Sequence, residues 1–261
     1  MNKIVVITGG TSGIGLALKT LYEQNGDTVI TMSKRETGEN NHYSVDMSDE
    51  DSVKNAFLDI GEKFKKIDVL INSAGFGMSG ITELIETSDI KNLTEVNYYG
   101  TLYAVRSSLK FMEKGAKIIN IASAMALFPV PFRAIYGSVK SAVLTLSFAL
   151  KMELAPLGIL VTAICPGDIK TNFTKNRVKN FKTSERYGNR LESATIKSDS
   201  REEKRIPCEK CAKQIYNKIK KNHLKPFYII GNKYKFLYFL TKFTPKSWLL
   251  SMTEKLYGGN D

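Results

Sequence analysis

The feature that most constrains this chain is a glycine-rich loop between a buried apolar run and an amphipathic segment. Residues 4–7 are apolar, an amphipathic stretch begins at Leu16, and between them the chain reads Thr8-Gly9-Gly10-Thr11-Ser12-Gly13-Ile14-Gly15. Glycines let the backbone turn tightly and approach a pyrophosphate, and the N-terminus of a following helix presents unpaired N–H groups and a favourable dipole. Glycines also make ordinary turns, but a strand before the loop and a helix after it indicate dinucleotide binding.

Apolar runs and amphipathic segments alternate along the first two thirds of the chain. The apolar runs are short and rich in Val and Ile, as buried strands are, and they cover residues 4–7, 28–32, 69–72, 117–122 and 160–164. Between them lie amphipathic segments, among them 16–25, 49–64 and 138–154. This alternation indicates βαβ units. The expected fold class is therefore α/β, with a single Rossmann-like, doubly wound parallel sheet and helices on both faces.

The 261 residues suit one large α/β domain followed by a helical extension. We expect the dinucleotide-binding catalytic domain to cover 1–230. Within it, residues 172–205 are polar and weakly periodic, which predicts a loop or lid at the substrate. Residues 227–230 predict a last strand. Aromatic side chains and lysines are interleaved over 231–261, which predicts an amphipathic C-terminal extension of two short helices.

The residues after the second apolar run favour NADP over NAD. An NAD-binding fold places an acidic side chain there, about 20 residues beyond the glycines, to hold the ribose 2'-hydroxyl. This chain instead has Ser33, Lys34 and Arg35. The two cations can pair with a 2'-phosphate and the hydroxyl can donate to it. The alternative is an exposed Lys-Arg pair without a ligand, which is common on protein surfaces.

Several further motifs follow the glycine loop in a fixed order. They are Asp46, Asn72-Ser73-Ala74-Gly75, Asn97 with Gly100, Ser123, Tyr136 with Lys140, and Pro166-Gly167 with Thr171. With the Thr-Gly-x-x-x-Gly-x-Gly spacing and the Tyr-x-x-x-Lys pair, the sequence resembles the short-chain dehydrogenase/reductase family over about residues 1–170. Ser73 is a departure, since many members have a second Asn there, and we expect a minor packing difference.

The resemblance implies a role for each of these residues. Asp46 would contact the adenine amino group, Asn97 would hold a water in a proton relay, and Thr171 would lie near the nicotinamide carboxamide. The whole expected cofactor set is Gly9, Thr11, Ser12, Gly13, Ile14, Gly15, Ser33, Lys34, Arg35, Asp46, Met47, Asn72, Ala74, Gly75, Tyr136, Lys140, Pro166, Gly167, Ile169 and Thr171. The expected catalytic set is Ser123, Tyr136, Lys140 and Asn97.

Tyr136 and Lys140 are four residues apart and can project from one face of a helix. A free phenol has a pKa near 10 and exchanges its proton poorly at neutral pH, but a nearby cation stabilises the phenolate. Ser123 follows the expected strand over 117–122, at the edge of the sheet where ligands bind. We expect Tyr136 to protonate the substrate oxygen and Ser123 to stabilise its developing charge while NADPH delivers a hydride.

The substrate is less well defined by the sequence. Apolar residues between Ser123 and Tyr136 would line one wall of the pocket, namely Met125, Leu127, Phe128, Val130 and Phe132. The long C-terminal tail resembles family members that act on lipids, steroids or retinoids, so we expect a hydrophobic ketone or secondary alcohol. The alternatives are a 3-oxoacyl thioester reductase, acting on a carrier protein or coenzyme A, and a non-enzymatic NADP-sensing protein.

The charge is concentrated in one part of the chain. The net charge is +12, and residues 175–225 contain sixteen Lys or Arg against six Asp or Glu. This segment could attract an anionic membrane, an acidic carrier or a phosphorylated substrate, or form a solvated face. We expect no nucleic-acid partner, because no binding motif accompanies the charge. The basic aromatic tail could contact a membrane peripherally, cover the pocket or pack on another subunit.

The remaining expectations concern cysteines, location and assembly. Cys208 and Cys211 form a Cys-x-x-Cys, but four zinc ligands are not in evidence, so we expect reduced thiols and no metal. The N-terminus lacks a signal-peptide pattern, and no run approaches the roughly 20 apolar residues of a membrane span, so the expected location is cytoplasmic. The family resemblance implies a homodimer or homotetramer.

Overall fold

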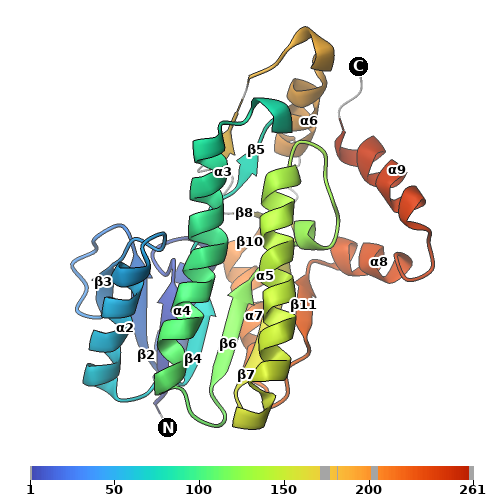
Figure 1. The fold of residues 1–261 in the computed structure, drawn as a ribbon. Coiled ribbons are helices and arrows are strands. Elements are labelled where there is room, and N and C mark those ends of the chain that lie inside the picture. Colours follow the sequence, from blue (N-terminus) through green and yellow to red (C-terminus); the bar gives the residue numbers. More distant parts are fainter. Residues whose placement is uncertain (1, 171–176, 181, 201–204, 259–261) are drawn as a thin grey trace.

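The computed structural model describes residues 2–170, 177–180, 182–200 and 205–258. At its centre is a parallel sheet of seven strands (Figure 1), in the spatial order β11 (Phe227–Ile230), β7 (Leu160–Pro166), β6 (Lys117–Ile121), β4 (Val69–Asn72), β1 (Ile4–Thr8), β2 (Thr28–Ser33) and β3 (His42–Ser44). The chain starts in the middle, adds β2 and β3 on one side, and then returns to build the other side from β4 onward. The expected doubly wound α/β fold is confirmed.

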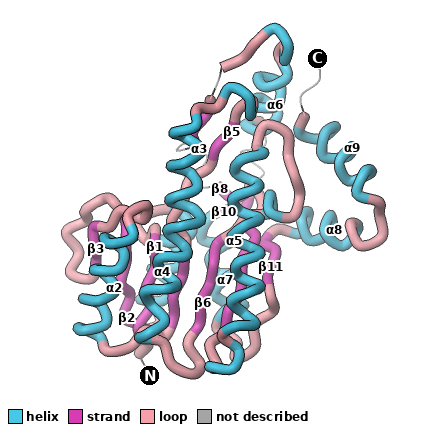
Figure 2. The backbone as a smooth tube through the Cα atoms, viewed as in Figure 1, coloured by secondary structure: helices cyan, strands magenta, loops and turns pink. Residues whose placement is uncertain are grey.

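Alternate side chains of the central strands face two different helical layers. Val6 points to the face covered by α2 (Glu50–Phe64), α4 (Gly100–Ser108) and α5 (Ala134–Glu153), where Phe57 and Ile60 are fully buried. Val5 and Ile7 point to the other face, covered by α1 (Gly13–Gln24) and α7 (Cys208–Ile219). Figure 2 shows the helices stacked against the strands. Because both faces are covered, these strands are apolar on both sides.

This topology places the binding crevice at the carboxyl ends of the strands. The strand order reverses between β1 and β4, and open α/β sheets bind ligands beyond the carboxyl edge at such a point. Two small parallel ladders extend this edge. Strand β5 (Met78–Ser79) pairs with β9 (Val178–Lys179), and β8 (Ile169–Lys170) pairs with β10 (Ile206–Pro207). Both ladders join residues distant in sequence at the mouth of the crevice.

The region expected to be an irregular lid is partly regular. Besides β9, it contains helix α6 (Arg190–Asp199), which packs near α9 (Lys246–Tyr257). Leu191 is buried, and Arg190 lies 3.7 Å from Glu254 in an ion pair. The polar composition hid this helix, because a single buried leucine gives only a weak periodic pattern.

The chain ends as a strand followed by two short helices, as the tail pattern predicts. Strand β11 pairs with β7, and α8 (Asn232–Leu240) and α9 follow it. Leu249 of α9 packs with Phe128 and with Tyr234 of α8, so this layer rests on the segment between Ser123 and Tyr136. In the described part of the chain, no helix is both long and apolar enough to cross a bilayer.

Candidate active site

The glycine loop folds into a cradle that leaves no room for side chains at two positions. Gly9 has φ +68°, and a Cβ there would lie 2.8 Å from the Cα of Ala74. A Cβ on Gly15 would lie 2.3 Å from the carbonyl oxygen of Gly9. The Thr8 hydroxyl accepts hydrogen bonds from the backbone N–H groups of Ser73 and Ala74, at 3.1 and 3.2 Å. Helix α1 starts at Gly13, so its free N–H groups face a loop shaped for close approach of a phosphate.

The residues expected to bind the adenosine end lie together beyond β2. The Thr11 hydroxyl donates to the Ser33 hydroxyl at 3.1 Å, and Lys34 forms an ion pair with Asp46, Nζ to Oδ2, at 2.7 Å. Hydrogen bonds from Lys34 and from Ser48 lower the pKa of Asp46 to about 2. The sequence pattern did not reveal this pair, which joins a residue expected at the 2'-phosphate to one expected at the adenine. Arg35 is exposed beside them.

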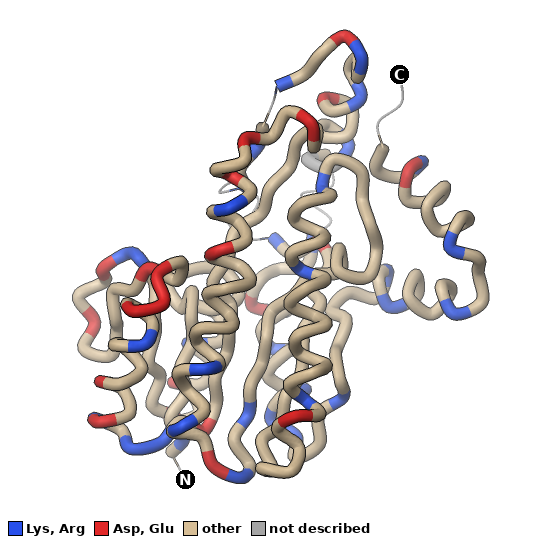
Figure 3. The backbone as a smooth tube through the Cα atoms, in the orientation of Figure 1, with Lys and Arg blue, Asp and Glu red and all other residues tan. Residues whose placement is uncertain are grey.

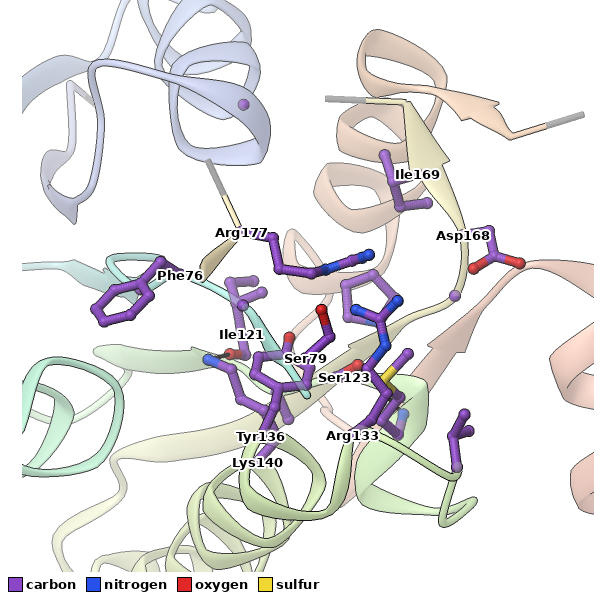
Figure 4. A pocket seen from close by; sticks show the side chains of 18 of the residues that line it. Phe76, Ser79, Ile121, Ser123, Arg133, Tyr136, Lys140, Asp168, Ile169 and Arg177 are labelled. Carbon is purple, nitrogen blue, oxygen red and sulfur yellow. Dashed lines mark hydrogen bonds between the residues drawn. The ribbon is translucent and has the colours of Figure 1, made fainter. Parts of the chain in front are cut away.

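Ser123, Tyr136 and Lys140 come together at the carboxyl edge of β6 (Figure 4). Ser123 lies two residues after the end of β6, and it shares a hydrogen bond with Tyr136 of α5. Burial raises the pKa of Tyr136 to about 12, against the lowering effect of that hydrogen bond and of two nearby arginines. Lys140 lies one turn further along α5, where its Nζ donates to the Ile121 carbonyl at 3.2 Å. Burial lowers its pKa to about 8.

Asn97 lies in a π-helical turn, Glu95–Tyr99, between α3 (Thr87–Thr94) and α4. Such turns are rare and often occur at functional sites. The Asn97 amide donates to the carbonyls of Phe76 (3.3 Å) and Leu93 (3.0 Å), while its buried Oδ1 has no partner among the described residues. A Cβ on Gly75 would lie 2.4 Å from this oxygen and 3.5 Å from Lys140 Nζ. Gly75 therefore keeps the space between Asn97 and Lys140 open.

One cavity of about 260 Å³ joins these parts. Residues of the expected sets that line it are Gly9, Ser12, Gly13, Ile14, Ala74, Gly75, Ser123, Tyr136, Lys140, Pro166, Gly167 and Ile169. Met125, Val130 and Phe132 also line it, whereas Leu127 and Phe128 pack beneath α8 and α9. The glycine cradle, the Ser-Tyr-Lys group and part of the expected apolar wall thus share one space.

Some expected residues lie away from this cavity. Thr11, Gly15, Ser33, Lys34, Arg35 and Asp46 belong to the cradle or to the expected adenosine end beyond it. Met47 is buried in the hydrophobic core. Asn72 is buried in the sheet, where its amide donates to Asn120 Oδ1 at 2.9 Å and Asn120 donates to Ser147. Asn72 therefore supports the sheet beside the cradle and is not at the cavity wall. Thr171 falls outside the described residues.

The structure adds cavity residues that sequence reasoning missed. Arg133, Arg177 and Arg205 line it, together with Phe76, Leu191 and Tyr257. Arg133 lies three residues before Tyr136, so its place near the site could have been predicted from the sequence. Arg177 and Arg205 come from distant segments of the chain. The described residues include all three cysteines, none of which forms a disulfide, and burial raises the pKa of Cys208 to about 11.

Comparison with known proteins places these features in a family. The family model of short chain dehydrogenases matches residues 3–182. The chain is 30% identical to a probable short-chain type dehydrogenase/reductase, VdlC of Helicobacter pylori, over 95% of this chain and 96% of that protein. It is 32% identical to a 3beta-hydroxysteroid dehydrogenase of Mediterraneibacter gnavus, over 69% of this chain and 71% of the relative. The structure of ElxO with NADP bound has a TM-score of 0.71 at 28% identity, covering 88% of this chain and 96% of ElxO. The chain belongs to the short-chain dehydrogenase/reductase family of oxidoreductases.

Proposed function

We propose that this protein is an NADP(H)-dependent oxidoreductase that interconverts a hydrophobic ketone and a secondary alcohol. The observation that carries the proposal is the hydrogen-bonded pair of Ser123 and Tyr136, with Lys140 behind it, in the same cavity as the glycine cradle. A nucleotide-binding protein without hydride chemistry has no need of a buried phenol beside a buried amine. The loop suits close approach of a pyrophosphate, because Gly9 and Gly15 pack too tightly against neighbouring backbone for any side chain and the free N–H groups at the start of α1 face the loop.

Each side chain has a defined task in this proposal. When bound, the reduced nicotinamide supplies the hydride. Tyr136, kept protonated by burial, donates its proton to the substrate oxygen, and the Ser123 hydroxyl donates a hydrogen bond to the same oxygen. Lys140 stabilises the phenolate that remains. Asn97 and Lys140 lie on either side of the space at Gly75, through which a water can return the proton.

The preference for NADP rests on the cations after β2 and on the similarity to ElxO, whose structure contains NADP. Lys34 is held by Asp46, so Arg35 is the cation that can turn toward a 2'-phosphate without breaking an ion pair. We expect Arg35→Ala to lower kcat/KM for NADPH about 10- to 100-fold, since a hydrogen bond to a charged group contributes roughly 1.5–3 kcal/mol. Steady-state kinetics with NADPH and NADH measures this effect.

Two controls make that experiment specific. The kcat/KM for NADH should change little in Arg35→Ala, because NADH lacks the 2'-phosphate. Lys54→Ala, which removes an exposed cation from α2, should leave both cofactors unaffected. Equal losses with NADPH and NADH in Arg35→Ala would contradict a role for Arg35 in cofactor choice.

A hydrophobic substrate is supported by the cavity wall and by one relative. Met125, Val130, Phe132 and Phe76 line the cavity near Tyr136, and the similarity to a 3beta-hydroxysteroid dehydrogenase points in the same direction. NADPH oxidation against steroid ketones, long-chain ketones, retinal and acetoacetyl thioesters tests the proposal. Turnover confined to thioesters would instead assign a 3-oxoacyl thioester reductase. Cofactor binding without turnover of any carbonyl would favour the sensing protein.

We further propose that α8 and α9 contact an anionic membrane surface. Large apolar side chains are exposed on this layer, with exposed fractions of 61% for Phe236, 56% for Phe239, 72% for Phe243 and 51% for Trp248. Lysines lie between them, and residues 232–253 contain no Asp or Glu. Figure 3 shows Lys and Arg on this layer, with acidic residues only near the end of α9. Apolar faces enter the membrane interface, and each lysine near an anionic surface contributes roughly 1 kcal/mol.

Vesicle co-sedimentation tests the membrane proposal. We expect the protein to bind vesicles that contain phosphatidylglycerol and to bind pure phosphatidylcholine weakly, because the lysines require anionic lipid. The double substitution Phe239→Glu/Phe243→Glu should abolish binding. Met152→Glu is the matched control, because Met152 is 71% exposed at the far end of α5. Equal binding by both variants, or a stable dimer formed through Phe239 and Phe243, would refute membrane contact through this layer.

The assembly is proposed from family resemblance alone. We propose a homodimer or homotetramer built through the helices that carry Asn97 and Tyr136. On this side, the exposed Tyr99 ring stacks on the half-buried Tyr103 ring, with the centroids 6.0 Å apart. Light scattering of the purified protein measures the subunit number, and a monomer would refute the proposal.

A further inference from the structure

The cavity contains more positive charge than hydride transfer requires. Arg133, Arg177 and Arg205 line it in addition to Lys140, whereas Asp168 is the single acidic residue among the described residues of its wall. Asp168 accepts a hydrogen bond from the Tyr234 hydroxyl at 2.7 Å. The proposed hydride transfer needs the phenol of Tyr136, the hydroxyl of Ser123 and the amine of Lys140. The arginines therefore call for a separate explanation.

Arg133 is held in place by the turn that starts α5. It caps that helix, three residues before Tyr136, and only 9% of it is exposed. The preceding residue, Phe132, has φ +60°, a left-handed conformation that is strained for a non-glycine residue. The Phe132 carbonyl accepts a hydrogen bond from the Gly80 N–H at 3.0 Å, which fixes this turn against β5. The strained backbone thus directs a buried guanidinium to the cavity.

Arg177 and Arg205 are placed by the two small ladders. Arg177 immediately precedes β9, and the Val178 N–H donates to the Gly77 carbonyl at 2.9 Å. Arg205 immediately precedes β10, and the Ile206 N–H donates to the Asp168 carbonyl at 3.0 Å. The two strands of a ladder lie far apart in the sequence, by about 40 residues for β8 and β10 and by about 100 residues for β5 and β9. Their pairing therefore brings each arginine to the cavity from a distant segment. Backbone pairing gives these positions more rigidity than a free loop would.

Arg133 and Arg177 approach the reacting hydroxyl from two sides. Figure 4 shows both side chains directed into the space above Ser123 and Tyr136, Arg133 from the start of α5 and Arg177 from the opposite wall. Their charges both act to lower the pKa of Tyr136, which requires proximity to its hydroxyl. The apolar side chains Phe76, Met125 and Val130 share the same cavity. The wall is therefore amphiphilic, with a cationic pair close to the reacting centre.

We propose that the substrate carries a carboxylate or phosphate group, which Arg133 and Arg177 bind beside the reacting carbonyl. A guanidinium presents a planar fork of donors that matches either anion, and its hydrogen bonds to it are strong in a water-poor cavity. The inference deepens the proposed hydride transfer and rests on it. Within the proposed class of hydrophobic ketones, the substrate is then one that also carries an anionic group, and the same ketone without that group is turned over less efficiently.

Matched pairs of compounds test this inference. The carboxylate pair is 4-oxodecanoate and its methyl ester, and the phosphate pair is 2-oxooctyl phosphate and 1-hydroxyoctan-2-one, so that each anion lies within a few bonds of the ketone. We expect kcat/KM to favour the anionic member of at least one pair by about 10- to 100-fold, given the strength of charged hydrogen bonds. The preference should fall to near unity in Arg133→Leu and in Arg177→Leu. Arg186→Leu, which removes an exposed arginine paired with Glu83, should keep it.

A binding measurement separates this inference from the proposed reaction. Calorimetric titration of the same compounds into the protein saturated with NADP+ reports anion binding whether or not a hydride is transferred. One outcome is that the anionic compound binds more tightly, that Arg133→Leu and Arg177→Leu remove this preference, and that no compound is turned over. This outcome would support the anion site and refute the proposed function. Equal binding and turnover of both members in each pair would refute the anion site and support the function. If Arg133→Leu and Arg177→Leu weaken NADPH binding but leave the anion preference intact, the arginines hold the cofactor and the inference is overturned.

Discussion

Replacing Tyr136 by phenylalanine is expected to lower kcat by about 10²- to 10⁴-fold, the usual contribution of a general acid or base. The substitution removes one oxygen from a buried ring, so packing in the cluster with Met78 and Val139 should persist. NADPH should still bind, because the glycine cradle is built from Gly9, Gly15 and the start of α1. Single-turnover kinetics gives the loss in the chemical step, and fluorescence titration gives the dissociation constant for NADPH.

The control for this substitution is Tyr43→Phe. Tyr43 lies on β3, where its hydroxyl donates to Asp59 at 2.5 Å, outside the cavity. Removal of the Tyr43 hydroxyl should change the free energy of unfolding slightly and should leave kcat unchanged. Substantial activity in Tyr136→Phe would remove Tyr136 from the mechanism and leave Ser123 as the proton donor to be tested. A parallel loss of NADPH binding would indicate a collapsed cavity.

The parts of the site that depend on local sequence were predictable. The glycine loop follows a strand and opens a helix, so the tight turn through Gly9, Gly13 and Gly15 could be predicted from the sequence. The four-residue interval between Tyr136 and Lys140 required only a helix to bring them to one face. The alternation of apolar runs with amphipathic segments predicted a parallel sheet with helices on both faces. In each case, the residues that form the pattern lie in one helix or strand or in the next element along the chain.

The parts that depend on contacts between distant segments were not predictable in the same way. Arg177 reaches the cavity because β9 pairs with β5, and Arg205 reaches it because β10 pairs with β8. Each ladder has two residues per strand, too few to produce a periodic pattern. The ion pair between Lys34 and Asp46 likewise joins residues on either side of β3. The expectation of one apolar wall rested on apolar residues between Ser123 and Tyr136, and it did not include Arg133 from that same segment.

The buried position of Lys140 is expected to lower the stability of the folded protein at neutral pH. Burial lowers the pKa of Lys140 from 10.5 to about 8, so below pH 8 the folded, cofactor-free protein must keep an unfavourable ammonium group that the unfolded chain solvates freely. A shift of this size corresponds to about 3 kcal/mol, and loss of the hydrogen bond to the Ile121 carbonyl offsets about 1 kcal/mol of it. Lys140→Met is therefore expected to unfold with a free energy about 2 kcal/mol higher at neutral pH, while losing turnover.

The sign of the pH dependence makes this last prediction specific. As pH rises from about 8 to 10.5, the folded native protein releases the Lys140 proton before the unfolded chain does. The unfolded state then binds more protons, so this group's destabilising contribution disappears across that window. The stability advantage of Lys140→Met should accordingly shrink through the same window. Urea denaturation of both proteins without cofactor, at neutral and alkaline pH, measures it. A variant less stable than the native protein at neutral pH would show that the ammonium group is already paired in the folded state and that its charge stabilises the fold.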